Sequence, residues 1–535
     1  MADPGEYRLE TMTTQKTSVQ AQANAVVVED LSSKMNDEQI LAHFGKRQQF
    51  KRNFGLISIL GLGCTLMLTW EGSVANLLPP LINGGPTGAI AAFPVVMFGV
   101  FLQILVMAEM ASMIPLSGGQ YNWVAILAPQ SCSNFLSYTT GWITAIAWQA
   151  AAASATWIDA TLLLTIVSVN YPSYNMQMWH AVLIFYAIIA LAVFVTTYLG
   201  RIFPSLEAMV LVLHIVGFFA ILIVLVYLAP KTPSDVVFHT VINGGGFKTN
   251  AESILVGAVI LMYNFNGVDA ATHMAEEIEN AAVVIPRAMI LTVFINGFTG
   301  FAMLIALIFC MGPLEEILTS TFPYPFILIL GSITNSMSGT TVLAAIILVM
   351  GISASIGLIA TASRMLWAFS RENGVPFSRY VSRIEPRTAL PIYSIAITAL
   401  ISLLLALIPL GSTTAFYALT GLTVAGFYSS FMVSASVMLW RRLTTPSANI
   451  AWGPFRLGKM GVPITIVALI YSFIGWIFSF WPPVAAVTIH TFNWSLVVYF
   501  GVVILSMAYY GLRARKTYTG PKVEIENVVH EDGKE

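Results

Sequence analysis

The sequence is poor in charged residues and in cysteine. Only 10% of its 535 residues are Asp, Glu, Lys or Arg, whereas soluble domains carry about 25%. A water-soluble enzyme of this length is therefore excluded. The formal net charge of -1 provides no basic surface for nucleic acid. The three cysteines, Cys64, Cys132 and Cys310, form neither a disulfide framework nor a CxxC metal pair, so we expect no metal and no cofactor.

Long apolar runs dominate what remains. Hydrophobic residues make up 57% of the chain, and the mean hydropathy is +0.78. Because a bilayer core needs about 20 apolar residues per helix, the sequence predicts an all-α polytopic membrane protein with about twelve spans. These spans are 54–80, 88–111, 134–168, 179–199, 204–229, 252–274, 286–311, 337–369, 389–409, 413–440, 461–481 and 493–513.

The basic residues predict how the chain is oriented. If the amino terminus is cytoplasmic, nearly all Lys and Arg next to the membrane fall on the cytoplasmic side, and only Lys231 and Lys248 fall in outer loops. Both termini are therefore expected inside. We divide the chain into a disordered cytoplasmic tail (1–45), a transporter core of ten helices (46–440), two further helices (441–514) and a carboxyl-terminal cytoplasmic tail (515–535).

Acidic residues occur where a bilayer makes them costly. A charged side chain at the centre of a spanning helix costs about 2.5–3.5 kcal/mol on insertion scales. His214 and His273 are the only bases at similar depth, so the missing positive charge is expected to come from a substrate or a proton. The acids within or at the edges of the apolar runs are Glu71, Glu109, Asp159, Glu207 and Asp269.

Two spans contain residues that disfavour a regular helix. The first carries Gly61 and Gly63, and the sixth carries the polar run 263–269; Gly and Asn are poor helix formers. Breaks five spans apart are typical of the five-plus-five inverted repeats of secondary transporters. The alternative is that the glycines permit close helix packing.

Three motifs resemble the amino acid–polyamine–organocation superfamily, and in particular its fungal amino acid, choline and GABA permeases. The motifs are 108–121 (AEMASMIPLSGGQY), 269–289 (DAATHMAEE followed by VIPRAM) and 367–376 (WAFSRENGVP). The resemblance covers about residues 50–515. It implies twelve helices, a LeuT-like core of two inverted repeats with helices 1 and 6 broken, alternating access, and import driven by a proton or another ion without direct use of ATP.

The resemblance also implies a substrate site at the two breaks. In span one, backbone amides would hold a substrate carboxylate, as helix amino termini do for anions in general. In span six, aromatic and carbonyl groups would meet the apolar body and the amine of the substrate. The matching positions are Gly61, Leu62, Gly63, Cys64 and Thr65 in span one and Tyr263, Asn264, Phe265, Asn266 and Gly267 in span six.

Trp70 and Glu71 lie just beyond the first break, and both are candidate substrate-binding residues. Glu71 would attract a substrate amine or carry a coupled proton; the alternative is a protonated Glu that hydrogen-bonds to a neighbouring helix. Trp148 is a candidate wall of a cage for a quaternary ammonium group, or else a packing residue. Asp159, in the outer part of span three, is a weaker candidate that would face an outer vestibule.

Four further residues are candidates for proton coupling or gating. Asp269 and His273 lie four apart on one helix face, where they would form a proton relay, an inner gate or the structural end of span six. Glu207 and His214 share a face of span five. In some proton-coupled relatives a titratable side chain on this span replaces the sodium ion of other members; the alternative for His214 is a packing role.

These observations predict a proton-coupled importer of a small amine or amino acid, such as choline, GABA or a related zwitterion, in the plasma membrane. It is not expected to be an enzyme, and its expected partners are the substrate, a proton and the lipid bilayer. The alternatives are a nutrient sensor of the same fold and a membrane-embedded transferase. The seven histidines are too scattered for the latter. The sequence does not choose among choline, GABA, other amino acids and polyamines, nor does it predict an oligomeric state.

Overall fold

The computed structural model describes residues 36–518, except 321, 387 and 412, together with residues 520 and 521. The regular elements of this part of the chain are all helices, and the only extended pairings within it are three isolated bridges. The prediction of an all-α polytopic protein is confirmed. The predicted tail segments 1–35 and 522–535 lie outside the described residues.

Within the described residues, eleven helices are long and apolar enough to cross a membrane. The first consists of two pieces, α3 and α4, on either side of Leu68. Their bounds are α3 Leu56–Met67 with α4 Thr69–Ala75, α6 Gly85–Met113, α8 Ser133–Asn170, α9 Met178–Tyr198, α10 Phe203–Leu228, α14 Ala281–Phe309, α17 Met337–Arg371, α19 Ile392–Leu405, α21 Thr413–Thr444, α22 Gly461–Ser479 and α23 Ser495–Tyr509.

The remaining predicted span, 252–274, is interrupted. The apolar helix α12 (Asn250–Tyr263) ends at the polar run, and α13 (Ala270–His273) begins after it. Gly267 adopts a φ of +102° in this interval, a conformation that glycine tolerates and most residues do not. The predicted break in the sixth span is therefore present where the sequence placed it.

Shorter helices connect the long ones or cover their ends. They are α2 Asp37–His43, α5 Leu78–Ile82, α7 Gln120–Leu127, α11 Ser234–His239, α15 Leu314–Leu318, α16 Phe326–Thr334, α18 Ser378–Val381, α20 Ile408–Gly411 and α24 Arg515–Thr517, with short 3-10 helices at 275–277, 447–449 and 458–460 and a π-helical turn at 510–514.

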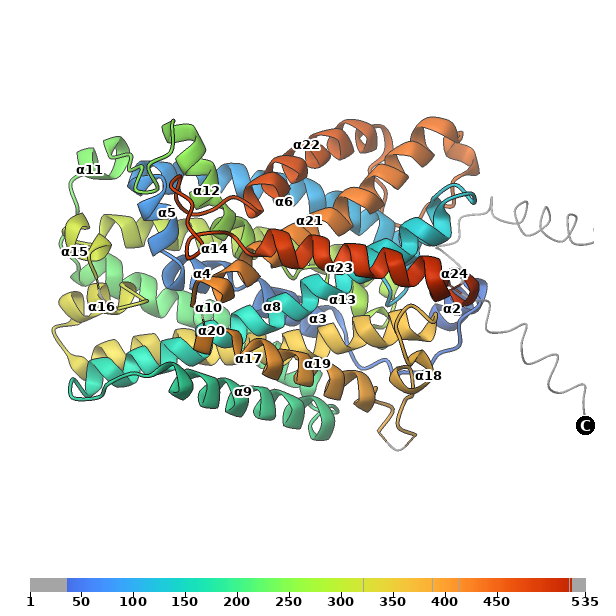
Figure 1. Ribbon diagram of the computed structural model, residues 1–535, viewed down its shortest axis with the longest axis horizontal. Helices are drawn as coiled ribbons and strands as arrows, with labels where there is room; N and C mark the ends of the chain where they lie inside the picture. Colours follow the sequence, from blue (N-terminus) through green and yellow to red (C-terminus); the bar gives the residue numbers. More distant parts are fainter. Residues whose placement is uncertain (1–35, 321, 387, 412, 519, 522–535) are drawn as a thin grey trace, which may run out of the picture.

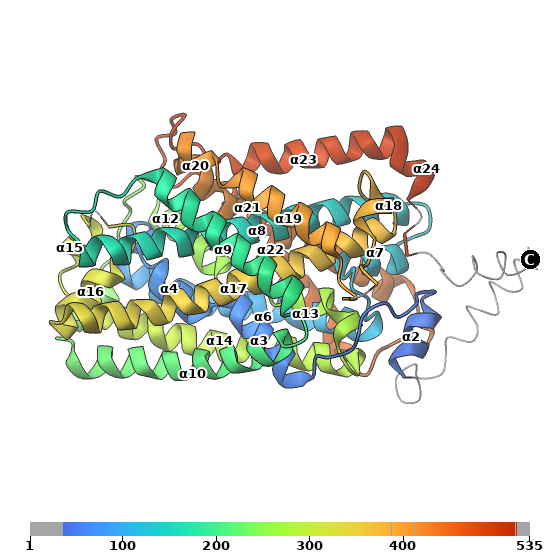
Figure 2. The same cartoon turned by 90° about the horizontal axis from the view of Figure 1, so that it is seen from below.

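The long helices run side by side along the longest axis of the molecule (Figure 1). Helices α2 and α24 lie at the same end in both views, and α15 and α16 lie at the opposite end (Figures 1 and 2). We call the end with α2 and α24 the terminal end. Since the described chain starts and finishes there, it crosses the bundle an even number of times, as twelve spans require.

Helix α2 falls within the stretch that the sequence predicted to be a disordered tail. A capping box stabilises it, because the Asn36 side chain accepts from the Gln39 N–H and the Gln39 side chain accepts from the Asn36 N–H. Leu41 is buried. The Asp37 carboxylate accepts from the backbone N–H groups of Asn280 and Ala281 at the start of α14. These tertiary contacts order a polar segment that has no apolar run.

The break in span one lies later than the sequence predicted. Residues 61–65, expected to be unwound, are regular helix inside α3, and the chain breaks at Leu68, whose φ of 44° is left-handed. The glycines instead permit close packing. A Cβ atom at Gly61 would collide with the backbone oxygen of Glu207 on α10, and one at Gly63 would lie 2.6 Å from Oγ1 of Thr292 on α14.

Contacts around α14 and α8 place both breaks inside the bundle. Helix α14 packs against α3, α4 and α6, while α8 packs against α17 and α21, and α12 packs against α6 and α21. Leu68 and the interval 264–269 thus lie among the long helices of the bundle. The relation of the two halves by an inverted repeat remains a prediction.

Candidate functional site

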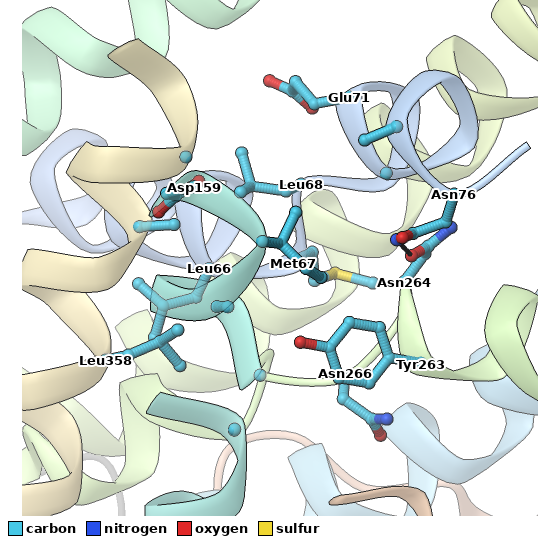
Figure 3. A pocket seen from close by; sticks show the side chains of 18 of the residues that line it. Leu66, Met67, Leu68, Glu71, Asn76, Asp159, Tyr263, Asn264, Asn266 and Leu358 are labelled. Atoms are coloured by element: carbon cyan, nitrogen blue, oxygen red, sulfur yellow. Dashed lines mark hydrogen bonds between the residues drawn. The ribbon is translucent and has the colours of Figure 1, made fainter. Parts of the chain in front are cut away.

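A cavity lies between the two breaks. Its empty volume, which includes space open to solvent, is about 720 Å³. Its walls come from the α3–α4 break, the α12–α13 interval, α8, α17 and α21. Figure 3 shows Glu71, Leu68 and Asp159 on one part of the wall and Asn76, Asn264 and Tyr263 on another. Among the described residues that line it, none is Lys, Arg or His.

Five of the predicted substrate-binding residues line this cavity, and eight do not. The five are Glu71, Tyr263, Asn264, Asn266 and Gly267. The residues that lie outside its lining are Gly61, Leu62, Gly63, Cys64, Thr65, Trp70, Trp148 and Phe265. For the span-one set the reason is the position of the break, because residues 61–65 are buried in the body of α3.

The aromatic candidates lie just behind the wall. The Phe265 ring packs on Phe93 with centroids 5.3 Å apart. The Trp148 ring packs edge-on against Phe427, at 5.0 Å, and it is Phe427 that lines the cavity. Trp148 therefore supports the wall without forming it, so the predicted cage wall from span three is not observed at this residue.

Several lining residues were not among the predicted binding residues. Asp159 carried a signal as an intramembrane acid, but was assigned to an outer vestibule. Leu66, Met67 and Leu68 could have been found only by placing the break correctly. The small residues of α17, such as Gly351, and Phe427 of α21 carry no sequence signal, because only packing brings these helices to the site.

Glu71 forms a buried pair with His214. Its Oε1 lies 2.7 Å from Nδ1 of His214, and the two side chains are 2% and 0% exposed. Trp70 Nε1 donates to the same Nδ1 at 3.2 Å. Since an indole N–H can only donate, this bond requires a free lone pair on Nδ1, and Glu71 then carries the proton. When Nδ1 carries the proton instead, it donates to a Glu71 carboxylate. The geometry accommodates one proton in two positions.

Asp159 has a different environment. Ser355 of α17 donates its hydroxyl to Oδ2 of Asp159 at 2.7 Å, and Thr156 donates to Ser355 at 3.1 Å. Oδ1 accepts no hydrogen bond from any described residue. Gly351 leaves room for this carboxylate, because a Cβ atom there would overlap Oδ1. The carboxylate is 4% exposed and faces the cavity without a basic partner.

Amide groups supply the remaining polarity. Asn76 Nδ2 donates to Asn264 Oδ1 at 2.9 Å, the bond drawn in Figure 3. The amide nitrogens of Asn264 and Asn266 are buried and donate to no described residue. Tyr263 lies 2.9 Å, oxygen to oxygen, from Ser154 of α8. The residues that line the cavity thus include two amide groups with unused donors as well as the Asp159 carboxylate.

The span-one break is held by tertiary hydrogen bonds. A leucine in the left-handed region costs about 1–2 kcal/mol, so the conformation of Leu68 needs support. The N–H of Thr69 donates to the Asn296 side chain at 3.2 Å, and the Thr69 hydroxyl donates to the backbone oxygen of Asn264 at 2.9 Å. The second bond ties one break directly to the other.

The other proton-coupling candidates lie away from the cavity. Glu207 is 2% exposed on α10, and its Oε2 has no hydrogen-bond partner among the described residues. Asp269 accepts from Gln120 at 2.7 Å. His273 Nδ1 donates to the backbone oxygen of Ser117 at 3.0 Å, and its Nε2 lies 3.8 Å from Asp269. Asp269 and His273 thus hold the α12–α13 segment against the loop before α7.

Other buried acids toward the terminal end have full basic partners. The pairs are Lys46 with Glu372 at 3.2 Å, Arg371 with Glu276 at 3.0 Å, Arg364 with Glu277 at 3.0 Å and Arg442 with Glu109. We call these four the terminal ion pairs. Glu109, a predicted intramembrane acid, therefore obtains its positive charge from Arg442 at the end of α21.

No group of three His, Cys, Asp or Glu side chains within the described part of the chain is arranged to hold a metal ion. The cavity and its immediate surroundings present carboxylates, one buried imidazole, amides and aromatic rings.

Comparison with known proteins gives a consistent result. Residues 54–503 match the family model described as amino acid permease. The chain is 29% identical over 477 residues to the choline transporter of Saccharomyces cerevisiae, covering 88% of this chain and 82% of that protein. It is 27% identical over 540 residues to the GABA-specific permease of the same yeast, covering 97% and 92%. It is 29% identical over 485 residues to the swainsonine transporter of Arthroderma benhamiae, covering 88% and 92%.

Proposed function

Because the chain belongs to the amino acid permease family, we propose that it imports a small amine or amino acid by alternating access, coupled to a proton. The family consists of permeases and not of enzymes, and the chain has eleven candidate membrane-spanning helices among its described residues, which supports a multi-pass membrane transporter. The proposed substrates are choline, GABA or a related zwitterion, as the names of the relatives favour.

The observation that carries this proposal is the cavity between two helix breaks. Secondary transporters bind substrate where irregular backbone faces an internal cavity. Here the lining includes Glu71 and Asp159 but no described basic residue, which suits a positively charged amine. The unused amide donors of Asn264 and Asn266 suit a substrate carboxylate or hydroxyl. These donors replace residues 61–65, whose backbone amides are engaged in α3.

The Glu71–His214 pair is the proposed proton-coupling site. It borders the cavity through Glu71 and accommodates a proton on either Glu71 or His214. An unprotonated buried pair would leave an uncompensated charge, which is costly in a low-dielectric interior. We infer that proton loss from this pair and substrate release occur together. Glu207, on the same face of α10 as His214, is a candidate for the next group that binds the proton.

Asp269 and His273 are proposed to act in gating. Their partners are Gln120, the first residue of α7, and Ser117 in the loop before it, not groups of the cavity. A movement of α13 during the transport cycle would have to break these bonds. The proposed location is the plasma membrane with both termini cytoplasmic, which rests on the distribution of Lys and Arg in the sequence.

The test is uptake by purified protein in liposomes under an inward proton gradient. We expect saturable accumulation of at least one of choline, GABA, proline, polyamines or basic amino acids, abolished by a protonophore. Absence of uptake for the whole panel would refute the proposal. A ligand that raises thermal stability without being transported would instead favour the nutrient sensor.

Glu71→Gln tests the coupling assignment. We expect uptake to fall strongly while expression and folding stay near normal, because Gln keeps the shape and loses the exchangeable proton. Uptake with an unchanged pH dependence would show that Glu71 does not carry the coupled proton.

A further inference from the structure

We propose that Asp159 is the counter-ion for the positively charged head of the substrate and so selects cationic solutes over neutral ones of the same shape. This inference rests on the proposed transport function and adds to it a residue and a selection rule. The proton would be handled by Glu71, and the substrate charge by Asp159.

The two carboxylates of the cavity are not equivalent. Glu71 is 2.7 Å from the imidazole of His214, so a base already stands beside it. Asp159 has only the Ser355 hydroxyl, at 2.7 Å on Oδ2, and its Oδ1 is unengaged by the described residues. A neutral hydroxyl does not compensate a buried carboxylate, because burying an ion without an opposite charge is strongly unfavourable. The carboxylate is therefore completed by a cation that enters the cavity.

The surroundings of Asp159 form a built site. Thr156 donates to Ser355, and Ser355 donates to Asp159, so the carboxylate is oriented by a short relay between α8 and α17. Gly351 lies directly against Oδ1, where any side chain would displace it. One oxygen is thus held by the Ser355 hydroxyl, and the other accepts no hydrogen bond from the described residues.

The rest of the cavity suits an alkylated or primary ammonium group. The rings of Tyr263 and Phe427 line it with Asp159, and aromatic faces attract cations, most strongly when these are desolvated. Figure 3 shows the Asn76–Asn264 pair across the cavity from Asp159. A substrate with a cationic head and a polar tail, such as an amino alcohol or an amino acid, can engage both sides at once.

Asp159→Asn is the test, because it keeps the shape of the side chain and removes its charge. Binding is measured with purified protein by competition and thermal stabilisation, using choline and its uncharged analogue 3,3-dimethyl-1-butanol. Losing one partner of a desolvated charge pair costs several kcal/mol, so we expect choline affinity to fall by at least about tenfold. Binding of the uncharged analogue should be weak in the native protein and little changed in the variant.

Three further variants test the assignment of Asp159 as the counter-ion. Asp235→Asn, which removes an exposed carboxylate on α11, is the matched control and should change nothing. Ser355→Ala removes the orienting donor and should weaken choline binding by a smaller factor. Gly351→Ala should resemble Asp159→Asn, because its methyl group displaces Oδ1. If Asp159→Asn does not fold, Ser355→Ala decides between a graded loss and no effect.

The outcomes separate the two proposals. If the native protein transports no solute, the proposed function fails. If it transports a cation whose affinity is the same in the native protein and in the folded Asp159→Asn variant, the function stands and the assignment of Asp159 is overturned. A native protein that binds the charged and uncharged analogues equally well would also overturn the selection rule.

Discussion

Buried acids occur in two regions of this molecule, and the two regions treat them differently. At the terminal ion pairs, Glu109, Glu276, Glu277 and Glu372 each meet a Lys or Arg. At the cavity, Glu71 meets a histidine and Asp159 meets a hydroxyl group. All six acids are less than 10% exposed, so their burial is similar. What differs is whether a permanent positive charge lies beside the buried carboxylate.

The difference indicates what each region is for. A carboxylate with a permanent cation beside it is electrically complete, so the terminal ion pairs hold helices together and attract nothing further. A buried carboxylate whose partner is titratable or neutral has no permanent positive charge beside it. We propose that a proton supplies this charge at Glu71 and a substrate cation supplies it at Asp159.

The largest effect is expected when a terminal ion pair is broken. Arg442→Ala leaves Glu109, which is fully buried, without its cation. Removing one partner of a buried pair costs about 3–5 kcal/mol, and we expect that loss in the free energy of unfolding, measured by denaturation in detergent.

The matched control is Arg441→Ala, one residue earlier on α21, which should cost far less. The double variant Glu109→Gln with Arg442→Met removes both charges and should recover most of the loss. A stability unchanged by Arg442→Ala would show that the terminal end does not depend on this pair.

A change of intermediate size is expected at the titratable pair. His214→Ala removes one of the two positions for the shared proton and leaves Glu71, so uptake should fall about tenfold, equivalent to about 1.4 kcal/mol, and its dependence on pH should shift. The measurement is initial uptake in liposomes across a series of external pH values.

His239→Ala provides the histidine control, because that side chain is 75% exposed on α11 and should leave the profile unchanged. A profile for His214→Ala that matches the native one would remove this residue from the coupling scheme and leave the Asp159 assignment untouched.

The smallest effect concerns a neutral contact at the terminal end. Tyr518 is buried against Tyr138 and Phe369. The Ser137 hydroxyl donates its hydrogen to the Tyr121 carbonyl. The Ser137 oxygen is therefore the acceptor of the hydrogen bond from the Tyr518 hydroxyl, at 2.5 Å. Burial raises the pKa of Tyr518 well above its ordinary value, so the phenol stays a neutral donor.

Tyr518→Phe should therefore lower the free energy of unfolding by about 1 kcal/mol. The difference should not depend on pH below the ordinary tyrosine pKa of about 10, and should shrink at higher pH, where tyrosine ionises in the unfolded chain while the buried phenol stays neutral. Tyr518→Ala, which also removes the ring, should cost more. Equal stabilities for all three proteins would show that the segment after α24 contributes nothing to the terminal end.

The sequence predicted much of the fold and less of the site. Long apolar runs mark the spans because hydrophobicity along the chain is a local property, and the polar run 263–269 marks the sixth-span break for the same reason. The first break was misplaced because glycine has two uses in a membrane helix. Gly61 and Gly63 serve close packing with α10 and α14, while the break occurs at Leu68, which has no local signal.

The titratable residues show the same division. Glu71, His214 and Asp159 were recognisable because charge in an apolar run is conspicuous. Their partners were not predictable from spacing. The sequence distance from Glu71 to His214 says nothing of contact, and Ser355 is an ordinary helix residue until α17 packs against α8.

The sequence by itself thus determined that this is a multi-pass helical permease with acidic residues inside its membrane-spanning segments. Composition, periodicity and motifs are local properties of the chain, so they can be recognised without the tertiary structure. Only the tertiary structure decided which acid meets which partner. Compensation of a buried charge depends on groups a few ångströms away in space, and in a helical bundle those groups come from helices far apart in sequence. For this reason Glu109 is paired with Arg442, whereas Glu71 is the proposed proton site and Asp159 the proposed counter-ion.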